Sequence, residues 1–405
     1  MVPPLSSPAG ATTLTLLHQF SSTDGSDPIG GLVVDPNTGT LYGTTPYGGG
    51  TGNGTVFSLT PPAAGTAKWQ FQTIYTFKGN ADGSRPQNGL AINPAGTALY
   101  GTTQTGSTLC SCGTVFRLLK PGKPGREWGK TLFHEFSGDS FDGVVPSSAP
   151  FLDSASSELY GTTGSIGGSG GTIFRLSPVD GSHFKVIYNP AQNVGDFVGY
   201  HPQGVVVRNG IVYGTAFDGA YAGTLFQFSG QGGKILHGFM GPDGAYPQTP
   251  PIVGSDGTLY GTTYEGGKPA DCPESPGCGV VWKQSPGASE TKLHSMAFFT
   301  QPRDGMNPNA PLVLDAHTGT LYGATPAGGL GTECGAVGGS CGTVFTIDGN
   351  GKYRVIWEFP KGGPAVPEGQ LVFRAGVLFG TSYDGGKPCP DQHYIGCGTV
   401  WMLTP

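Results

Sequence analysis

Charged residues and long apolar segments are both scarce in this chain of 405 residues. Only 12% of the residues are charged and the formal net charge is −6, so the charge pattern does not favour binding to nucleic acid or to an anionic membrane surface. No apolar run approaches the roughly 18 residues of a membrane-spanning helix. No segment has the 3.6-residue apolar period of an amphipathic helix. We therefore expect no nucleic-acid partner, no membrane span and no substantial helix.

Motifs of metal-binding proteins are also missing. The eight His include no HxH or HExxH pattern and the eight Cys include no CxxC pair, so no metal site and no cofactor are predicted. The cysteines form four local pairs instead: Cys110/Cys112, Cys272/Cys278, Cys334/Cys341 and Cys389/Cys397. Such pairs are typical of disulfides in an oxidising compartment, although the ring closed by Cys110 and Cys112 is very short and its pairing stays open.

The first residues give no targeting signal of their own. Residues 1–10 have neither the charged nor the apolar region of a signal peptide. Because the cysteine pattern indicates an oxidising compartment, we expect a secreted or cell-surface protein with residues 1–11 as a flexible lead-in. We also expect a monomer.

A unit of about 56 residues recurs seven times along the chain. Its first anchor is Leu-Tyr-Gly-Thr-Thr or a variant, beginning at Leu41, Leu99, Leu159, Val212, Leu259, Leu321 and Leu378. Its second anchor is Gly-Thr-Val-Phe or a variant, beginning at Gly54, Gly113, Gly171, Gly223, Gly279, Gly342 and Gly398. An apolar run precedes the first anchor, and a run that ends in an aromatic residue commonly follows the second.

Each unit therefore holds four short β-rich segments separated by turn residues. Four strands per repeat predict an all-β, seven-bladed β-propeller with four antiparallel strands in each blade. The chain begins with a fourth-type segment at 12–20 and ends with a third-type segment, so the N-terminal strand should complete the last blade. The predicted propeller spans 12–405. Its blades cover approximately 29–77, 87–136, 147–188, 203–239, 248–299, 309–359, and 368–405 together with 12–20.

The units LYGTTPYGGGTGNGTVFSLTP and LYGTTQTGSTLCSCGTVFRLLKP resemble the Gloeo/Verruco (GloVer) tandem-repeat family of secreted bacterial proteins. The resemblance covers essentially the whole chain. It implies an exported or surface-associated propeller, but it implies no reaction and no catalytic residues.

The loops between blades mostly carry the pattern Asp-Gly-x-x-Pro. Its aspartates are Asp24, Asp82, Asp142, Asp243 and Asp304. Five-fold recurrence favours a structural role, in which Asp accepts local backbone hydrogen bonds and Pro ends the turn. Metal binding by these aspartates is the alternative.

The residues on either side of the loop proline differ from blade to blade. Those before it are Asp27, Arg85, Val145, His201, Tyr246, Asn307 and Val366, and those after it are Ile29, Gln87, Ser147, Gln203, Gln248, Asn309 and Glu368. Strand order places both sets around one mouth of the central channel, on the face that we name the top. The polar members of these sets predict hydrogen bonding to a polar ligand; the alternative is a solvated rim that holds only water.

The loops between the two anchors lengthen in the last three blades. They hold 15, 16 and 15 residues there, and each contains a cysteine pair. These loops carry Tyr264, Glu265, Tyr383, Asp384 and His393. Tyrosines beside carboxylates suit sugars, whose C–H faces stack on aromatic rings. The alternative is a surface elaboration without a ligand.

Three functions remain open from the sequence. The favoured one is a non-catalytic propeller that binds extracellular polysaccharide or oligosaccharide. A glycan-active enzyme is the second, either a hydrolase with two carboxylates from among Glu265, Glu368 and Asp384, or a lyase with Tyr200 or His201 as base and Arg85 as cation. The third is a structural module of a surface assembly.

Overall fold

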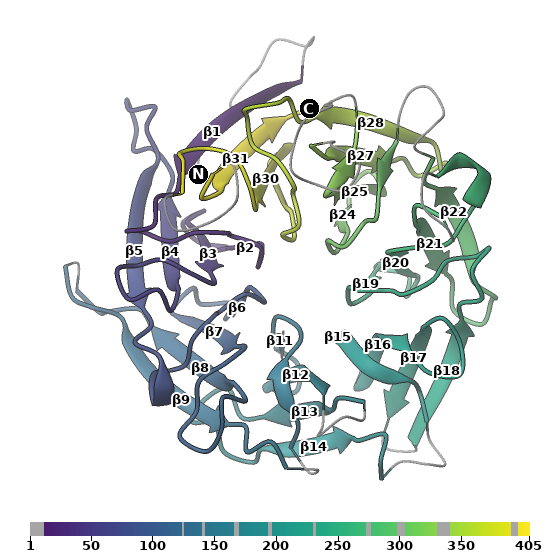
Figure 1. Ribbon diagram of the computed structural model, residues 1–405, viewed down its shortest axis with the longest axis horizontal. Helices are drawn as coiled ribbons and strands as arrows, with labels where there is room; N and C mark the ends of the chain where they lie inside the picture. Colours follow the sequence, from purple (N-terminus) through teal and green to yellow (C-terminus); the bar gives the residue numbers. More distant parts are fainter. Residues whose placement is uncertain are drawn as a thin grey trace.

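Seven blades surround a common axis in the computed structural model (Figure 1), which describes residues 12–123, 125–139, 142–165, 170–192, 197–229, 232–272, 277–297, 304–329, 341–389 and 396–405. The lead-in 1–11, Cys334 and His393 lie outside these residues. The predicted all-β propeller with four antiparallel strands per blade is confirmed. The described residues contain no α-helix, only the 3-10 turns η1 (Asn80–Asp82) and η3 (Pro269–Asp271). None of their helices could cross a membrane.

The strands of each blade follow the chain from the axis outward. Blades 1 to 3 contain β2 (Leu32–Val34), β3 (Leu41–Thr45), β4 (Thr55–Thr60), β5 (Gln70–Thr76); β6 (Leu90–Ile92), β7 (Ala98–Thr103), β8 (Thr114–Leu119), β9 (Gly129–Glu135); and β11 (Phe151–Asp153), β12 (Glu158–Ser165), β13 (Ile173–Leu176), β14 (Lys185–Tyr188). Blades 4 to 6 contain β15 (Tyr200–Arg208), β16 (Ile211–Asp218), β17 (Thr224–Ser229), β18 (Gly232–Gly238); β19 (Ile252–Val253), β20 (Leu259–Thr263), β21 (Val280–Gln284), β22 (Thr291–Ser295); and β24 (Val313–Asp315), β25 (Thr320–Thr325), β27 (Thr343–Ile347), β28 (Tyr353–Glu358).

The seventh blade is assembled from both ends of the chain. It contains β29 (Val372–Arg374), β30 (Val377–Ser382), β31 (Thr399–Thr404) and, as its outermost strand, β1 (Thr13–Gln19). β1 runs antiparallel to β31, with Thr13 opposite Thr404 and Gln19 opposite Thr399. The two strands lie side by side in Figure 1. The predicted closure by the N-terminal strand is therefore confirmed, and it covers the free edge of β31.

The glycine of the first anchor makes room for the aromatic ring of the second. Gly43 lies directly opposite Phe57 across the β3–β4 pair, and a Cβ at Gly43 would lie within 3.0 Å of the Phe57 ring. The same conflict recurs in every blade, at the pairs Gly101/Phe116, Gly161/Phe174, Gly214/Phe226, Gly261/Trp282, Gly323/Phe345 and Gly380/Trp401. These rings are fully buried, so the two anchors form one packing unit.

The first glycine of the second anchor makes room for the next blade. Gly113 has φ +96°, and a Cβ there would lie 2.6 Å from Cδ of Pro146. Every blade repeats this approach, at Gly54/Pro86, Gly171/Pro202, Gly223/Pro247, Gly279/Pro308, Gly342/Pro367 and Gly398/Pro28. The last pair joins blade 7 to blade 1. The loop proline and the anchor glycine thus set the close stacking of neighbouring blades.

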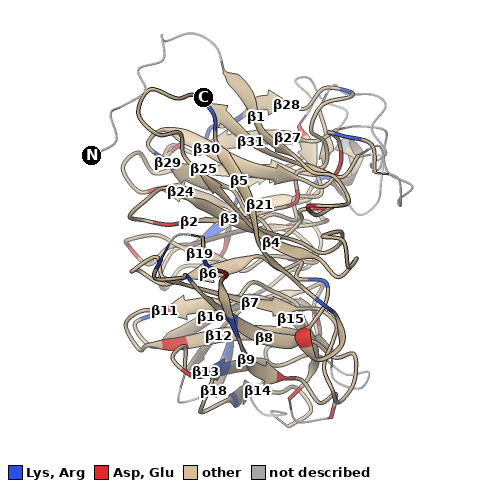
Figure 2. Cartoon of the chain, turned by 90° about the vertical axis from the view of Figure 1, so that its left-hand side faces the viewer, with Lys and Arg blue, Asp and Glu red and all other residues tan. Residues whose placement is uncertain are grey.

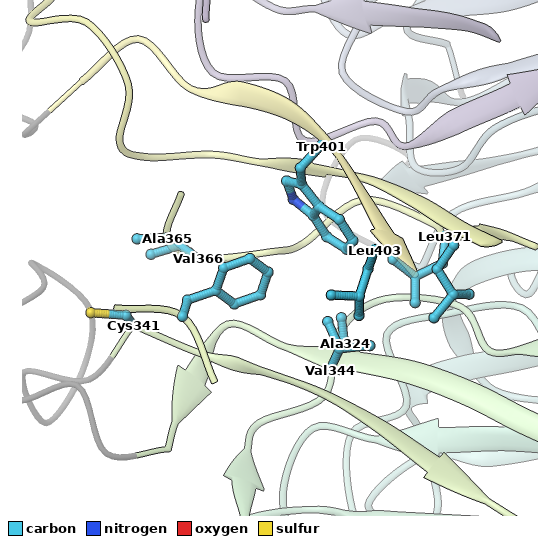
Figure 3. Close-up of a cluster of buried hydrophobic side chains, with 10 residues drawn as sticks. Ala324, Cys341, Val344, Ala365, Val366, Leu371, Trp401 and Leu403 are labelled. Carbon is cyan, nitrogen blue, oxygen red and sulfur yellow. The ribbon is translucent and has the colours of Figure 1, made fainter. Parts of the chain in front are cut away.

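Apolar side chains fill the space between adjacent blades. Between blades 6 and 7, Val344 packs with Trp401 and Leu403 (Figure 3), and all three are 0% exposed. Burying a side chain of this size contributes roughly 1.5–3 kcal/mol. Six similar clusters are described around the ring. Charged residues are few and scattered along the chain (Figure 2).

Disulfides close the predicted local pairs wherever both cysteines are described. These are Cys110–Cys112, Cys272–Cys278 and Cys389–Cys397. Cys341 is also disulfide-bonded, and its expected partner Cys334 lies outside the described residues.

Candidate functional site

Seven residues on the top face share an unusual backbone conformation. They are the residues before the loop prolines, which we name the rim residues: Asp27, Arg85, Val145, His201, Tyr246, Asn307 and Val366. All seven have positive φ, between 52° and 62°. An L-residue in this left-handed region costs roughly 1–2 kcal/mol, and a β-branched residue such as Val145 is a genuine outlier there.

Hydrogen bonds hold the rim residues in this conformation. The backbone N–H of Arg85 donates to the carbonyl of Asn53 in the preceding blade, at 3.0 Å. The backbone N–H groups of the other six rim residues donate in the same way. The pairs of donor and accepting carbonyl are Asp27/Cys397, Val145/Cys112, His201/Gly170, Tyr246/Ala222, Asn307/Cys278 and Val366/Cys341. Each acceptor immediately precedes an anchor glycine. The rim is therefore one hydrogen-bonded frame that joins every blade to its neighbour.

A short backbone pairing joins two loops of the same blade. One is the loop that carries the rim residue, which we name the rim loop, and the other is the loop between the two anchors, which we name the anchor loop. The residue before each rim residue pairs with the anchor loop, as in Ser26 with Tyr47 and Ala245 with Glu265. In blades 3 and 6 the pairing is extensive enough to form extra strands, β10 (Val144–Pro146) on β12 and β23 (Gly305–Met306) on β26 (Ala327–Gly328). These strands were not expected from the sequence. They bring both sets of loops together on the top face.

Rim side chains contact different neighbours in different blades. The exposed Arg85 guanidinium lies over the Tyr47 ring, 5.3 Å from its centroid. Tyr246 stacks on Phe217 with ring centroids 5.0 Å apart. Nδ1 of His201 lies 3.0 Å from Oδ1 of Asp218. These contacts are local pairs.

The other rim residues are less accessible. Asn307 is buried, and its amide donates to the carbonyl of Tyr264 at 3.1 Å. Asp27 is also buried, whereas Tyr200, next to His201, is 39% exposed. The accessible polar part of the rim therefore consists of Arg85, His201 and Tyr246.

The residues after the loop prolines include one close polar pair. The Asn309 amide donates to Oε1 of Glu368 at 3.2 Å. Burial raises the pKa of the Glu368 carboxyl above its ordinary value, and the bond from Asn309 opposes this shift only in part. Gln203 donates to the carbonyl of His201 at 3.0 Å. Gln87 and Gln248 are half-buried.

The cysteine-containing loops place four of their candidate residues, Tyr264, Glu265, Tyr383 and Asp384, beside the rim. The N–H of Tyr264 donates to the carbonyl of Tyr246, and that of Tyr383 to Val366. Tyr264, Tyr383 and Glu265 are half-buried, whereas Asp384 is only 3% exposed. The Asp384 carboxylate accepts the N–H of Gly385 at 2.6 Å.

The aspartates of the Asp-Gly loops accept local hydrogen bonds. The N–H of Ser21 donates to Asp24 at 2.7 Å, and Nε2 of His18 lies 3.1 Å from the other carboxylate oxygen. The loops at Asp142 and Asp243 have equivalent backbone and His partners. These bonds are the ones that a structural role requires.

A surface pocket of about 360 Å³ opens beside the rim at the junction of blades 7 and 1. Its lining includes Ser22, Ser26, Tyr47 and Cys389, with several glycines from the first anchor loop. Tyr47 was not among the predicted site residues, because those lie beside the loop prolines and in the long cysteine-containing loops. The signal that could have found it is the glycine-rich loop that follows this tyrosine.

Comparison with known families identifies the repeat. The model of the Gloeobacter/Verrucomicrobia repeat matches residues 6–222 and 201–405. The chain belongs to this repeat family. A search of curated protein sequences found no match.

Solved structures similar to this Gloeobacter/Verrucomicrobia repeat chain are distant in sequence. A fungal alcohol oxidase in complex with copper is 12% identical with a TM-score of 0.56, covering 97% of this chain and 76% of that one. A Bacteroides uniformis protein provisionally assigned as a 6-phosphogluconolactonase is 12% identical with a TM-score of 0.51, covering 87% and 89%. An oligogalacturonate lyase in complex with manganese is 12% identical with a TM-score of 0.50, covering 97% and 98%. These similarities show the fold alone.

The seven Gloeobacter/Verrucomicrobia repeats thus share a backbone frame and differ in what they present on it. The frame comprises the anchor glycine, the loop proline and the hydrogen bond from the rim residue. The differences are concentrated at the rim side chains and in the anchor loops. Loops that vary on a constant scaffold are where binding residues are most often found.

Proposed function

We propose that the protein is a secreted propeller that binds extracellular glycan at the top-face mouth of its channel. One observation carries the proposal: all seven rim residues adopt a conformation that glycine takes almost without cost, yet none is glycine. Backbone strain that persists at equivalent positions is a motive for seeking a function there. The side chains kept at this cost include a cation, an imidazole and a phenol.

The chemistry of the rim suits a sugar. The stacked Tyr246 and Phe217 offer an aromatic face near the top surface, and Tyr47 offers a second beside Arg85. Sugar C–H groups pack on such faces, while guanidinium and amide groups bond to hydroxyls or carboxylates. Disulfides such as Cys272–Cys278 are compatible with an oxidising compartment and support secretion.

The test compares rim variants on a glycan array. Asn tolerates the left-handed region, so Arg85→Asn and Tyr246→Asn remove the side chains without adding backbone strain. Each should weaken glycan binding by about tenfold, equivalent to about 1.4 kcal/mol. Val145→Asn is the matched control, because it places the same residue at a rim position where the native side chain offers no hydrogen bond.

Two results would contradict the proposal. One is the absence of binding to any glycan by the wild-type protein. The other is that the wild type binds a glycan, but Arg85→Asn and Tyr246→Asn bind it as tightly as the control Val145→Asn does. If turnover is absent as well, a structural role in a surface assembly becomes the better explanation.

A glycan-active enzyme is a second candidate because of Glu368. A buried carboxyl with a raised pKa, held by an amide as Glu368 is by Asn309, is suited to donate a proton to a leaving group. If the protein is a glycan-active enzyme, a polysaccharide panel should reveal reducing-end release or absorbance from unsaturated uronides, and Glu368→Gln should abolish it. Retention of glycans without turnover supports the binding function instead.

A further inference from the structure

Outer strands of neighbouring blades meet in a recurring arrangement of side chains. A His near the end of one outer strand contacts the aspartate of the next Asp-Gly loop, as His18 does with Asp24. An aromatic ring from the following blade then stacks on that imidazole. The ring centroids are 3.6 Å apart for His18/Phe71 and His134/Phe184, and 3.8 Å apart for His294/Tyr353.

Between blades 1 and 2, a lysine takes the position of the stacking ring. Tyr75 takes the place of the His, and its hydroxyl donates to Asp82 at 2.6 Å. The following blade supplies Lys130 in place of the aromatic ring, and its ammonium donates to the Asp82 carboxylate at 2.7 Å. The position that Phe71, Phe184 and Tyr353 occupy in other blades, which we name the covering position, can therefore hold a positive charge beside the loop aspartate.

Blades 4 and 5 put a carboxylate at the covering position. Nε2 of His237 lies 2.8 Å from Oδ2 of Asp243, and Glu290 takes the place of Phe71, Lys130, Phe184 or Tyr353. One ligand atom from each of His237, Asp243 and Glu290 lies within 4.8 Å of the other two. Oε1 of Glu290 is shielded from solvent and has no hydrogen-bond partner among the described residues.

The charges around this cluster leave a place for a cation. The half-buried Glu290 carboxyl lies near the charge of Asp243, and Lys292 is the cation that also acts on it. The Lys292 ammonium is directed to the carbonyl of Pro242 at 3.1 Å. Two carboxyl groups and an imidazole nitrogen thus lie together where the equivalent arrangement between blades 1 and 2 holds an ammonium.

We propose that His237, Asp243 and Glu290 bind a divalent transition metal, with zinc preferred, which joins blade 4 to blade 5. One imidazole nitrogen and two carboxylate oxygens are a zinc donor set, with bonds of about 2.0–2.2 Å and a fourth position for water. Such bonds place ligand atoms about 3–3.5 Å apart. Ligand atoms that are now up to 4.8 Å apart must therefore approach by about 1 Å, whereas the imidazole and Asp243 atoms, 2.8 Å apart, must separate slightly. The imidazole favours zinc over calcium or magnesium, which prefer oxygen ligands alone.

The test measures zinc uptake by the full chain after chelator treatment and dialysis. Titration with zinc chloride, followed by metal analysis, should give one zinc per chain. At a free zinc concentration 100-fold above Kd, the Tm should rise by about 3 °C. Calcium chloride at the same concentration should give a smaller rise.

Glu290→Tyr is the decisive variant, because it copies the Tyr353 arrangement of blades 5 and 6 and should fold. It should lose both the zinc uptake and the rise in Tm. His317→Ala, which removes an exposed imidazole elsewhere, should keep both. Failure of the wild type to take up zinc, equal uptake by Glu290→Tyr, or an equal response to calcium would overturn the assignment.

Discussion

The approach of blade 1 to blade 7 can be tested by a pair of glycine substitutions. Gly398 has φ +88°, and a Cβ there would lie within 3.0 Å of the Pro28 ring and 2.7 Å from the carbonyl oxygen of Ser382. Gly376 has a similar φ of +81°, but a Cβ there would meet nothing within 4 Å. Gly376→Ala therefore incurs the conformational cost alone, whereas Gly398→Ala adds a steric conflict between blades.

The expected difference follows from these geometries. The positive φ costs both variants roughly 1–2 kcal/mol, and this contribution cancels in the comparison. Overpacking against fixed neighbours adds about 1–3 kcal/mol for Gly398→Ala. With an unfolding entropy of about 2.1 cal/mol/K per residue, the Tm of Gly398→Ala should fall below that of Gly376→Ala by about 1–4 °C.

Scanning calorimetry of the wild type and both variants measures this difference. All three proteins must keep their disulfides oxidised, and their far-UV circular dichroism should match before heating. If Gly398→Ala lowers the Tm no more than Gly376→Ala does, the glycine is not needed for blade stacking and the explanation of the second anchor is wrong.

Three further predictions concern charge, disulfides and closure. Burial alone raises the pKa of Asp82, but hydrogen bonds, led by that from Lys130, outweigh burial and lower the pKa. The resulting stability is present above the unfolded-state pKa of about 3.9 and is lost as the pH falls through the lower folded-state pKa. Asp82→Asn should therefore flatten the acid side of a Tm-against-pH profile. Replacing Cys389 and Cys397 together with Ser should destabilise the protein by about 2–3 kcal/mol, and a reductant should then have a smaller effect on the variant than on the wild type, as calorimetry can show. A chain that starts at residue 21 lacks β1 and exposes the edge of β31, so size-exclusion chromatography should detect oligomers; a monodisperse monomer would contradict that role of β1.

The fold was predictable because its key contacts are local in sequence. Gly43 and Phe57 belong to adjacent strands of one hairpin, and the same spacing recurs in all seven repeats. Strand order and closure followed from counting the segments at the two ends. The extra strands β10 and β23 were not predictable in this way, because they depend on how far two loops approach each other after the blades have formed.

The candidate site was predictable only in part. The positions flanking the loop prolines could be identified because the proline recurs, and the structure brings Asn309 and Glu368 together. The left-handed conformation of Val145 could not be foreseen, because a β-branched residue disfavours it and only the hydrogen-bonded frame imposes it. The cluster at Glu290 was missed because His237 and Glu290 are far apart in sequence and only the stacking of two blades joins them.

The pairing of β1 with β31 also determines how the ring responds to tension. Thr13 lies opposite Thr404, so a force that pulls these two residues apart opens the strand pair one rung after another rather than loading all rungs at once. The same proximity makes the protein suitable for circular permutation, with a short linker across these residues and new ends at the exposed turn around Gly65, where the space is open. Such a permutant would carry the seventh blade as an uninterrupted segment, and the join would move to a blade that is now continuous.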